Sequence, residues 1–286
     1  MKFQDLALLV VDERSDYIRT ASAESGLGEL IVEKDFWVVW LLEELFALSP
    51  SLGPFTFKGG TSLSKGYHAI ERFSEDIDIS IDRATLGFPH DEYFYNAPSA
   101  KEAKHRVEQI RGAVRQYAVE SLLPALRDQL TGKIQGAWSL ESGDPGSIRF
   151  HYPTTQTGAI GYIKPDVLIE FGHADSWPAT DVTISSYLVE ALEPVTGSIT
   201  VRILDPQRTF WRKRRSCTRS LIATSSFRSR SGIHATITTS RDSIAPISAH
   251  RRYRTRRYSK RSFALRACSS HRIGLVMISP SLAHCG

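Results

Sequence analysis

The sequence has little cysteine and no long apolar run. Its three cysteines, Cys217, Cys268 and Cys285, are odd in number, widely spaced and confined to the last part of the chain. They therefore form neither a metal-ligand pattern nor a disulfide framework. No apolar run approaches the roughly 20 residues that a membrane-spanning helix requires, and the first residues lack the basic and apolar regions of a signal peptide. These absences favour a cytoplasmic protein that does not act in a membrane.

Acidic side chains are almost missing from the C-terminal part of the chain. Residues 211–286 hold 17 Lys and Arg against one acid, Asp242, a net charge of +16, whereas residues 1–210 carry a net charge of −11. The overall charge of +5 is therefore an average over two unlike parts. We expect one folded domain over residues 1–210, with ample apolar content for a core, followed by a poorly ordered basic tail over residues 211–286.

The chain also lacks a nucleophile elbow, a Walker loop and a dinucleotide fingerprint. What it has is a glycine–hydroxyl turn, Lys58-Gly59-Gly60-Thr61-Ser62, followed by Asp76 and Asp78 within an apolar run. Alternate side chains of a strand point to the same side, so the two aspartates are expected to project together.

Carboxylates placed side by side repel each other unless a cation lies between them. Oxygen ligands at this spacing suit Mg²⁺, with Mn²⁺ as an alternative, and Mg²⁺ also binds substrate phosphates. A second strand pattern, residues 162–172, contains Asp166 and Glu170 on one face, and Glu170 is the better candidate for a third ligand. The ordinary alternative for either acid is a strand-end carboxylate paired with Lys164 or an arginine, and Asp166 is more simply explained in this way.

The glycine turn predicts an anion site, because glycines let backbone amides approach a phosphate closely. The candidate nucleotide-binding residues are Gly59, Gly60, Thr61, Ser62, Lys65 and Arg72. Two of these have ordinary alternatives: Lys65 as a solvated helix lysine, and Arg72 as a partner of Glu71 or Glu75.

The order of the expected elements indicates an α/β domain with a small mixed sheet. We expect helices over residues 16–25, 31–48, 62–70 and 100–130, the last one interrupted at Pro124. We expect strands over residues 56–58, 74–81, 136–141, 147–152, 162–172 and 198–204. Residues 182–192 fit either type.

Several stretches together resemble the nucleotidyltransferase toxins of the AbiEii/AbiGii type, from abortive-infection and type IV toxin–antitoxin systems. They are residues 32–37 (VEKDFW), 58–65 (KGGTSLSK), 72–78 (RFSEDID), 167–172 (VLIEFG) and 208–211 (RTFW). The resemblance spans residues 1 to about 211. It implies a polymerase-β-like nucleotidyltransferase fold in which Asp76, Asp78 and Glu170 bind Mg²⁺ and a nucleoside triphosphate. It also implies a cognate antitoxin, and an RNA acceptor such as tRNA.

The tail departs from that resemblance after Trp211. The family continues with a helical segment resembling YSRHYYDVSRL. Codons for those letters, read one base later, can encode IHATITTSRDS, which is the sequence of residues 233–243. Codons for family-like letters, read one base later in the same way, also give two further stretches of the tail, residues 213–223 and 274–280. We therefore expect the tail to be a frameshifted translation that replaces the family's helical lobe, so that the chain is a nucleotidyltransferase whose activity could be lost through the altered C-terminus.

Two other functions remain open from the residues. The basic tail would attract phosphate strongly, so the chain could be a nucleic-acid-binding protein in which the aspartate pair is structural. A glycosyltransferase also uses Asp-x-Asp with Mg²⁺ or Mn²⁺, although the glycine–hydroxyl turn before the pair argues against it.

Overall fold

The computed structural model describes residues 1–71, 73–88, 96–143, 146–156, 164–173 and 178–209. These residues belong to one compact unit, Met1–Gly232, and a second unit, Ile233–Gly286, lies outside the described residues. The expected tail over residues 211–286 and its expected lack of order therefore also lie outside them. Among the described residues, no helix is both long enough and apolar enough to cross a membrane.

A seven-stranded mixed sheet forms the centre of the fold, in the order β3-β4-β5-β2-β1-β7-β6. The strands are β1 (Phe55–Lys58), β2 (Ile77–Ile81), β3 (Ser139–Gly143), β4 (Ser147–His151), β5 (Asp166–Gly172), β6 (Ala179–Ile184) and β7 (Ile199–Leu204). The β2–β5 and β1–β7 pairs are parallel and the other pairs are antiparallel. The expected α/β class with a mixed sheet is confirmed.

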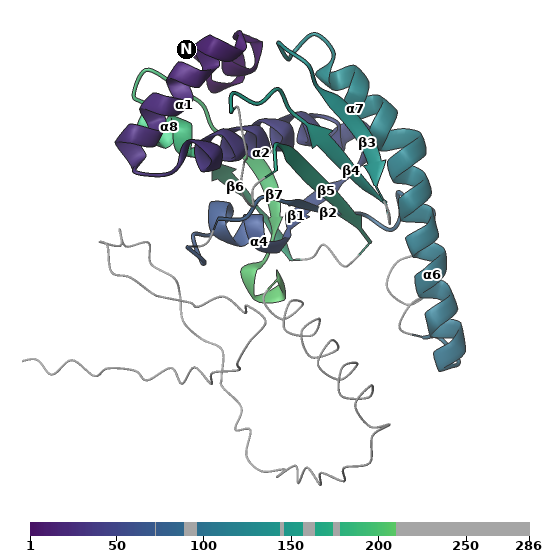
Figure 1. The fold of residues 1–286 in the computed structure, drawn as a ribbon. Coiled ribbons are helices and arrows are strands. Elements are labelled where there is room, and N and C mark those ends of the chain that lie inside the picture. Colours follow the sequence, from purple (N-terminus) through teal and green to yellow (C-terminus); the bar gives the residue numbers. More distant parts are fainter. Residues whose placement is uncertain (72, 89–95, 144–145, 157–163, 174–177, 210–286) are drawn as a thin grey trace, which may run out of the picture. The chain divides into compact units, whose positions relative to one another are not determined.

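Helices flank this sheet. They are η1 (Phe3–Leu8), α1 (Val11–Ser25), α2 (Glu29–Ala47), α3 (Ser49–Leu52), α4 (Gly59–Thr61), η2 (Ser62–Gly66), α6 (Ala100–Tyr117), η3 (Ala118–Leu122), α7 (Leu123–Leu130) and α8 (Tyr187–Ala191). Figure 1 shows α2 running along the sheet, with α1 and α8 near β6 and with α6 and α7 toward β3.

The core lies between α2 and one face of the sheet. Trp37 and Trp40 of α2 are fully buried and contact Phe150 of β4 through ring–ring packing. Ile77, Ile79 and Ile81 alternate along β2 and all enter this core, so the side chains between them belong to the opposite face of the sheet. Packing of these large apolar side chains is the main stabilisation of the domain.

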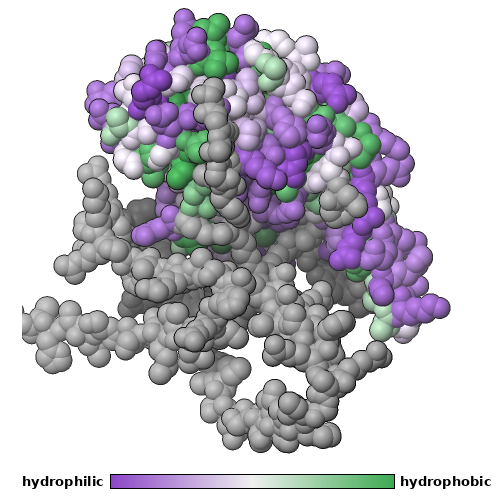
Figure 2. All heavy atoms as spheres, in the orientation of Figure 1, coloured by the Kyte–Doolittle hydropathy of each residue, from purple (hydrophilic) through white to green (hydrophobic). Residues whose placement is uncertain are grey.

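The long helical stretch after residue 100 is interrupted near Pro124, as expected. A π-helical turn, η3, separates α6 from α7, and Pro124 lies in the first turn of α7. Proline lacks the amide hydrogen that a regular α-helix would use there, and a wider turn accommodates that loss. Figure 2 shows that the surface of α6 is largely hydrophilic, and its basic residues are partly neutralised by the pairs Arg106–Glu102 and Arg111–Glu108.

Two boundaries near the glycine turn differ from the expectation. The helix expected over residues 62–70 begins earlier, at Gly59, and ends at Gly66, before His68, whose φ is +49°. The strand expected over residues 74–81 begins only at Ile77, so Asp76 precedes the strand instead of lying within it. The ambiguous stretch after residue 182 contains both types, the end of β6 and then α8.

Candidate active site

The glycine turn brings the end of β1 against the aspartate strand. Lys58 pairs with Asp78 across the antiparallel β1–β2 ladder, and the chain then turns at Gly59, where φ is +84°. A Cβ atom at Gly59 would lie 1.7 Å from Oδ2 of Asp78. Only glycine fits this position, because both the positive φ and the close approach exclude a side chain.

Hydroxyl groups of the turn hold it to the aspartate segment. Thr61 is 1% exposed, and its Oγ1 donates to the carbonyl oxygen of Asp76 at 2.5 Å and is hydrogen-bonded to Ser74 Oγ at 3.0 Å. Ser62 Oγ donates to the carbonyl oxygen of Gly59 at 3.0 Å. These contacts fix the turn relative to Asp76 and Asp78 and leave the backbone of Gly59 and Gly60 at the end of β1.

Asp78 and Glu170 lie side by side on neighbouring strands. They are directly paired in the parallel β2–β5 ladder, on the face opposite the core isoleucines. Burial, followed by the charges of Asp78 and Asp76 and a hydrogen bond that protonated Glu170 donates to Asp78, raises the pKa of Glu170. Burial, followed by the charges of Glu75 and Asp78, raises the pKa of Asp76. The three carboxylates therefore repel one another, and a cation would relieve that repulsion.

Lys58 is a residue of this site that the sequence reasoning did not single out. Its Nζ lies 3.9 Å from Oδ1 of Asp78, and a Cβ atom at Gly172 would come within 3.3 Å of the same Nζ. The ammonium group therefore lies between Asp78 and the end of β5. The alternation of β1, in which Phe55 and Phe57 are buried, was the signal that places Lys58 on the carboxylate face.

The donor chemistry of this face fits a hard divalent cation, because carboxylate oxygens from adjacent strands are ligands that Mg²⁺ accepts. Within the described residues, however, no three His, Cys, Asp or Glu side chains form a group that could hold a metal as they stand. The fit therefore lies in the shared face of Asp78 and Glu170 and in the nearby charge of Asp76, and not in a preformed cage.

Three other predicted residues have different surroundings. Asp166 is 8% exposed and accepts a hydrogen bond from Nη1 of Arg149 at 2.8 Å, which is the ordinary alternative stated for it. Lys65 is 6% exposed, and its Nζ lies 2.9 Å from Oδ1 of Asp35 and 3.7 Å from the ring centre of Tyr187. Its ammonium group is therefore engaged inside the fold. Arg72 lies outside the described residues.

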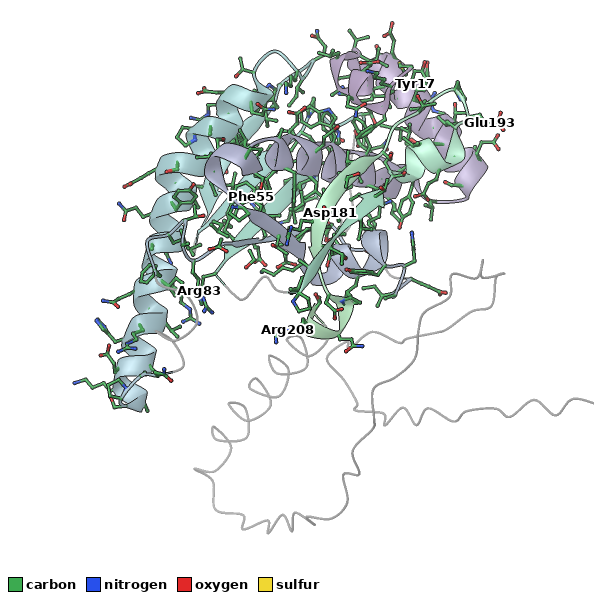
Figure 3. The ribbon with its side chains drawn as sticks, turned by 180° about the vertical axis from the view of Figure 1, so that it is seen from behind. Tyr17, Phe55, Arg83, Asp181, Glu193 and Arg208 are labelled. Carbon is green, nitrogen blue, oxygen red and sulfur yellow. The ribbon has the colours of Figure 1, made fainter. Side chains whose placement is uncertain are left out.

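A separate groove lies along α1 and contains none of the predicted site residues. It is lined by Leu9, Glu13, Asp16, Tyr17, Thr20, Leu192 and Pro194. Figure 3 shows Tyr17 and Glu193 at one end of the domain and Arg83, which follows β2, at the other end. The groove is thus separate from the site formed by Asp76, Asp78 and Glu170.

The mixed sheet, the glycine turn and the paired carboxylates define a protein with a nucleotidyltransferase-like fold. A family model, Nucleotidyl transferase AbiEii toxin, Type IV TA system, matches residues 40–242. The chain belongs to this family of nucleotidyl transferase toxins. The match begins after the VEKDFW stretch and continues beyond Trp211, whereas the resemblance read from the sequence covered residues 1 to about 211. No curated protein matched the chain, and no solved structure did.

Proposed function

We propose that the protein transfers a nucleotide from a nucleoside triphosphate to a hydroxyl group of an RNA acceptor, such as tRNA, with Mg²⁺ as the cofactor. One arrangement carries the proposal. Asp78 lies opposite Glu170 in the β2–β5 ladder, and the adjacent glycine turn is hydrogen-bonded to the backbone of Asp76. Membership of a nucleotidyl transferase toxin family supports the reaction type.

Each group of the site has a role in this proposal. Asp76, Asp78 and Glu170 would hold the cation, and Mn²⁺ would serve in place of Mg²⁺. A cation bound there would neutralise the triphosphate and activate the acceptor hydroxyl. The backbone of Gly59 and Gly60 would receive phosphate oxygens, while Thr61 and Ser62 keep the turn in shape. Lys65, which Asp35 holds, and Arg72 remain sequence predictions as nucleotide contacts.

The reaction joins the acceptor oxygen to the α-phosphorus and breaks the bond between that phosphorus and the bridging oxygen, so that pyrophosphate leaves and the hydroxyl proton is released to the solvent. The three carboxylates keep a negatively charged triphosphate away unless a cation is present. Transfer is therefore expected to depend strictly on the added metal. A cognate antitoxin, implied by the family, is the proposed protein partner, and the cytoplasm, which supplies nucleoside triphosphates and RNA, is the proposed location.

The test uses the full chain with Mg²⁺, each labelled nucleoside triphosphate in turn, and total RNA. We expect label transfer that Asp78→Ala abolishes, because this change removes the ligand that faces Glu170. Glu141→Ala is the control, since Glu141 is an exposed acid on β3, outside the carboxylate set. Transfer that persists unchanged in Asp78→Ala would remove the assigned site.

A second candidate function rests on the charge of the tail. A segment with 17 basic side chains and one acid would bind nucleic acid without any catalytic carboxylate. RNA binding that survives Asp78→Ala and disappears with the tail would favour this function. Transfer of a sugar from a nucleotide sugar, with no transfer of label from the triphosphates, would favour the glycosyltransferase.

A further inference from the structure

Three consecutive charged residues of α2 are buried in the core. Glu33 is 0%, Lys34 is 3% and Asp35 is 2% exposed. Charges removed from water are costly unless each is paired and hydrogen-bonded. Because successive helix residues point in different directions, each of the three reaches a different segment of the domain.

Glu33 and Asp35 hold segments other than the two that lead into β2 and β5. Glu33 accepts hydrogen bonds from Thr154 Oγ1 at 2.8 Å and from the backbone amide of Thr155 at 2.6 Å. Asp35 accepts from the backbone amide of Tyr187 at 2.7 Å in addition to its pair with Lys65. Both residues anchor loops and helices, and their environment requires no other role.

Lys34 reaches the two strands that carry the candidate metal ligands. Its Nζ forms an ion pair with Glu75, the residue immediately before Asp76. The same Nζ donates to the backbone carbonyl of Lys164 at 3.1 Å, and Lys164 precedes the start of β5. One buried ammonium group therefore connects the segment that precedes β2 to the segment that precedes β5.

The two tied strands are parallel neighbours. Their register places Asp78 opposite Glu170. A contact that fixes the N-terminal ends of β2 and β5 relative to each other therefore also fixes the distance between these two carboxylates. Lysine suits this place, because its ammonium group offers three donors from one point charge. The acceptor at Lys164 is a backbone carbonyl, whose position follows that of β5. The hydrogen bond from Lys34 therefore depends on where β5 begins.

We propose that Lys34 is a positioning residue for the carboxylate set, acting through Glu75 and the carbonyl of Lys164 to hold Asp76, Asp78 and Glu170 in a cation-binding arrangement. This inference rests on the proposed function. It assigns to a buried side chain, without contact to any reacting group, control over the affinity of the site for a divalent cation.

The test measures Mn²⁺ binding by the full-length protein without nucleotide, from the paramagnetic signal of free Mn²⁺. Lys34→Met removes the tie, and we expect it to weaken Mn²⁺ binding about 10-fold to 100-fold, as loss of an outer residue at a metal site does. In transfer assays kcat should fall more than the KM for the nucleoside triphosphate changes. Lys34→Arg, which keeps the charge and several donors, should restore part of the affinity.

Glu33→Gln is the matched control, because Glu33 is the neighbouring buried charge and holds the segment at Thr154 instead of the metal strands. It should lower the free energy of unfolding but leave the Mn²⁺ affinity within about twofold. If Lys34→Met does not fold, the double variant Lys34→Met with Glu75→Gln removes both charges. It should fold and still bind Mn²⁺ weakly, because the tie to Lys164 is absent.

The outcomes separate this role from the proposed function. Wild-type affinity for Mn²⁺ in the Lys34 variants, together with loss of binding in Asp78→Ala, would overturn the positioning role alone. Equal weakening by Glu33→Gln would also overturn it, since the effect would then be one of general stability. A wild-type protein that binds no Mn²⁺ would overturn the proposed metal site and the positioning role together.

Discussion

At the scale of single residues, the contact between Gly59 and Asp78 is the tightest constraint on the candidate site. Gly59→Ala would force a Cβ atom to within 1.7 Å of Asp78 Oδ2, so the carboxylate or the turn must move. We expect this variant to lose most of its Mn²⁺ binding and nucleotide transfer. Its free energy of unfolding should also fall by more than the roughly 1 kcal/mol that a positive φ alone costs.

Gly132→Ala is the control for Gly59→Ala. Gly132 has a similar φ of +78°, but a Cβ atom there meets nothing within 4 Å. It should therefore show the cost of the backbone conformation alone, about 1 kcal/mol in urea unfolding, with metal binding unchanged. If the two variants bind Mn²⁺ equally well, the close approach of Gly59 to Asp78 has no functional meaning.

His173, which follows β5, predicts a pH dependence of stability. Burial, followed by the charges of Arg83, Arg111 and Lys58, lowers the pKa of His173 from 6.5 to about 4. The unfolded chain therefore binds one more proton between these pH values, and the free energy of unfolding should fall as the pH is lowered through this window. The loss is up to about 3 kcal/mol.

Urea unfolding at pH 7 and at pH 4.5 measures this effect in the wild type and in His173→Gln. The raised pKa values of buried acids such as Glu33 act in the opposite direction, so the difference between the two proteins isolates His173. We expect His173→Gln to lose less stability at low pH than the wild type, while His105→Gln, at an exposed position on α6, behaves as the wild type does. Parallel losses in all three proteins would contradict the assignment.

Which site residues the sequence could predict depended on local periodicity. Asp78 and Glu170 alternate with buried isoleucines, so the pattern alone indicated their shared face. Asp76 precedes β2, and its backbone is set by Thr61, a contact between segments that periodicity does not encode. The same holds for Lys65, whose partner Asp35 lies 30 positions earlier in the chain.

At the scale of elements, the pair Asp35–Lys65 joins α2 to η2. Asp35→Asn should lower the free energy of unfolding by about 3–5 kcal/mol, because it leaves a buried ammonium group without its countercharge. Adding Lys65→Met should restore most of this loss, and urea unfolding of the two single variants and the double variant gives the coupling. Stabilities that simply add would contradict the pairing.

The double variant also tests the sequence prediction for Lys65. With stability restored, the KM for the nucleoside triphosphate depends on whether the ammonium group touched phosphate. An unchanged KM would mean that Lys65 has only a structural role. A raised KM would support the contact with phosphate that is predicted from the position of Lys65 after the glycine turn.

The elements themselves were predicted better than their arrangement. Turn residues and apolar spacing indicated most of the helices and strands, and the missing amide of Pro124 placed the interruption before α7. The order of the strands in the sheet could not be predicted from local sequence patterns. The neighbours of β1 are β2 and β7, and β7 lies far from β1 in the sequence. The η1 turn, held by the amide of Phe3 on the carbonyl of Thr196 at 2.9 Å, depends on a similarly distant partner.

At the scale of the whole molecule, the reading frame after Trp211 bears on activity. The family match extends to residue 242, while the letters of the tail fit a one-base shift of family-like sequence. The frameshift remains a prediction. Resequencing the gene, together with the intact mass of the protein made in its own host, decides it: we expect a continuous family-like frame in the DNA. An open frame that confirms this tail would contradict it.

The charge contrast between the two parts of the chain predicts where non-specific RNA binding lies. Residues 1–210 carry a net charge of −11 and residues 211–286 a net charge of +16, so phosphate should be attracted by the tail and repelled by the rest. For single-stranded RNA the logarithm of the binding constant falls with the logarithm of salt concentration by about 0.7 for each phosphate neutralised. We expect the full chain to show a steep slope of several phosphates in filter binding.

A chain that ends at residue 210 should lose this salt-sensitive binding. It should retain Mn²⁺ binding, since Asp76, Asp78 and Glu170 lie within the residues that remain. Asp78→Ala in the full chain is the reciprocal control, with the salt slope kept and Mn²⁺ binding lost. If the shortened chain binds RNA with the same slope, the acceptor surface lies on the domain that carries the carboxylates, and the tail is not needed to bring RNA to the site.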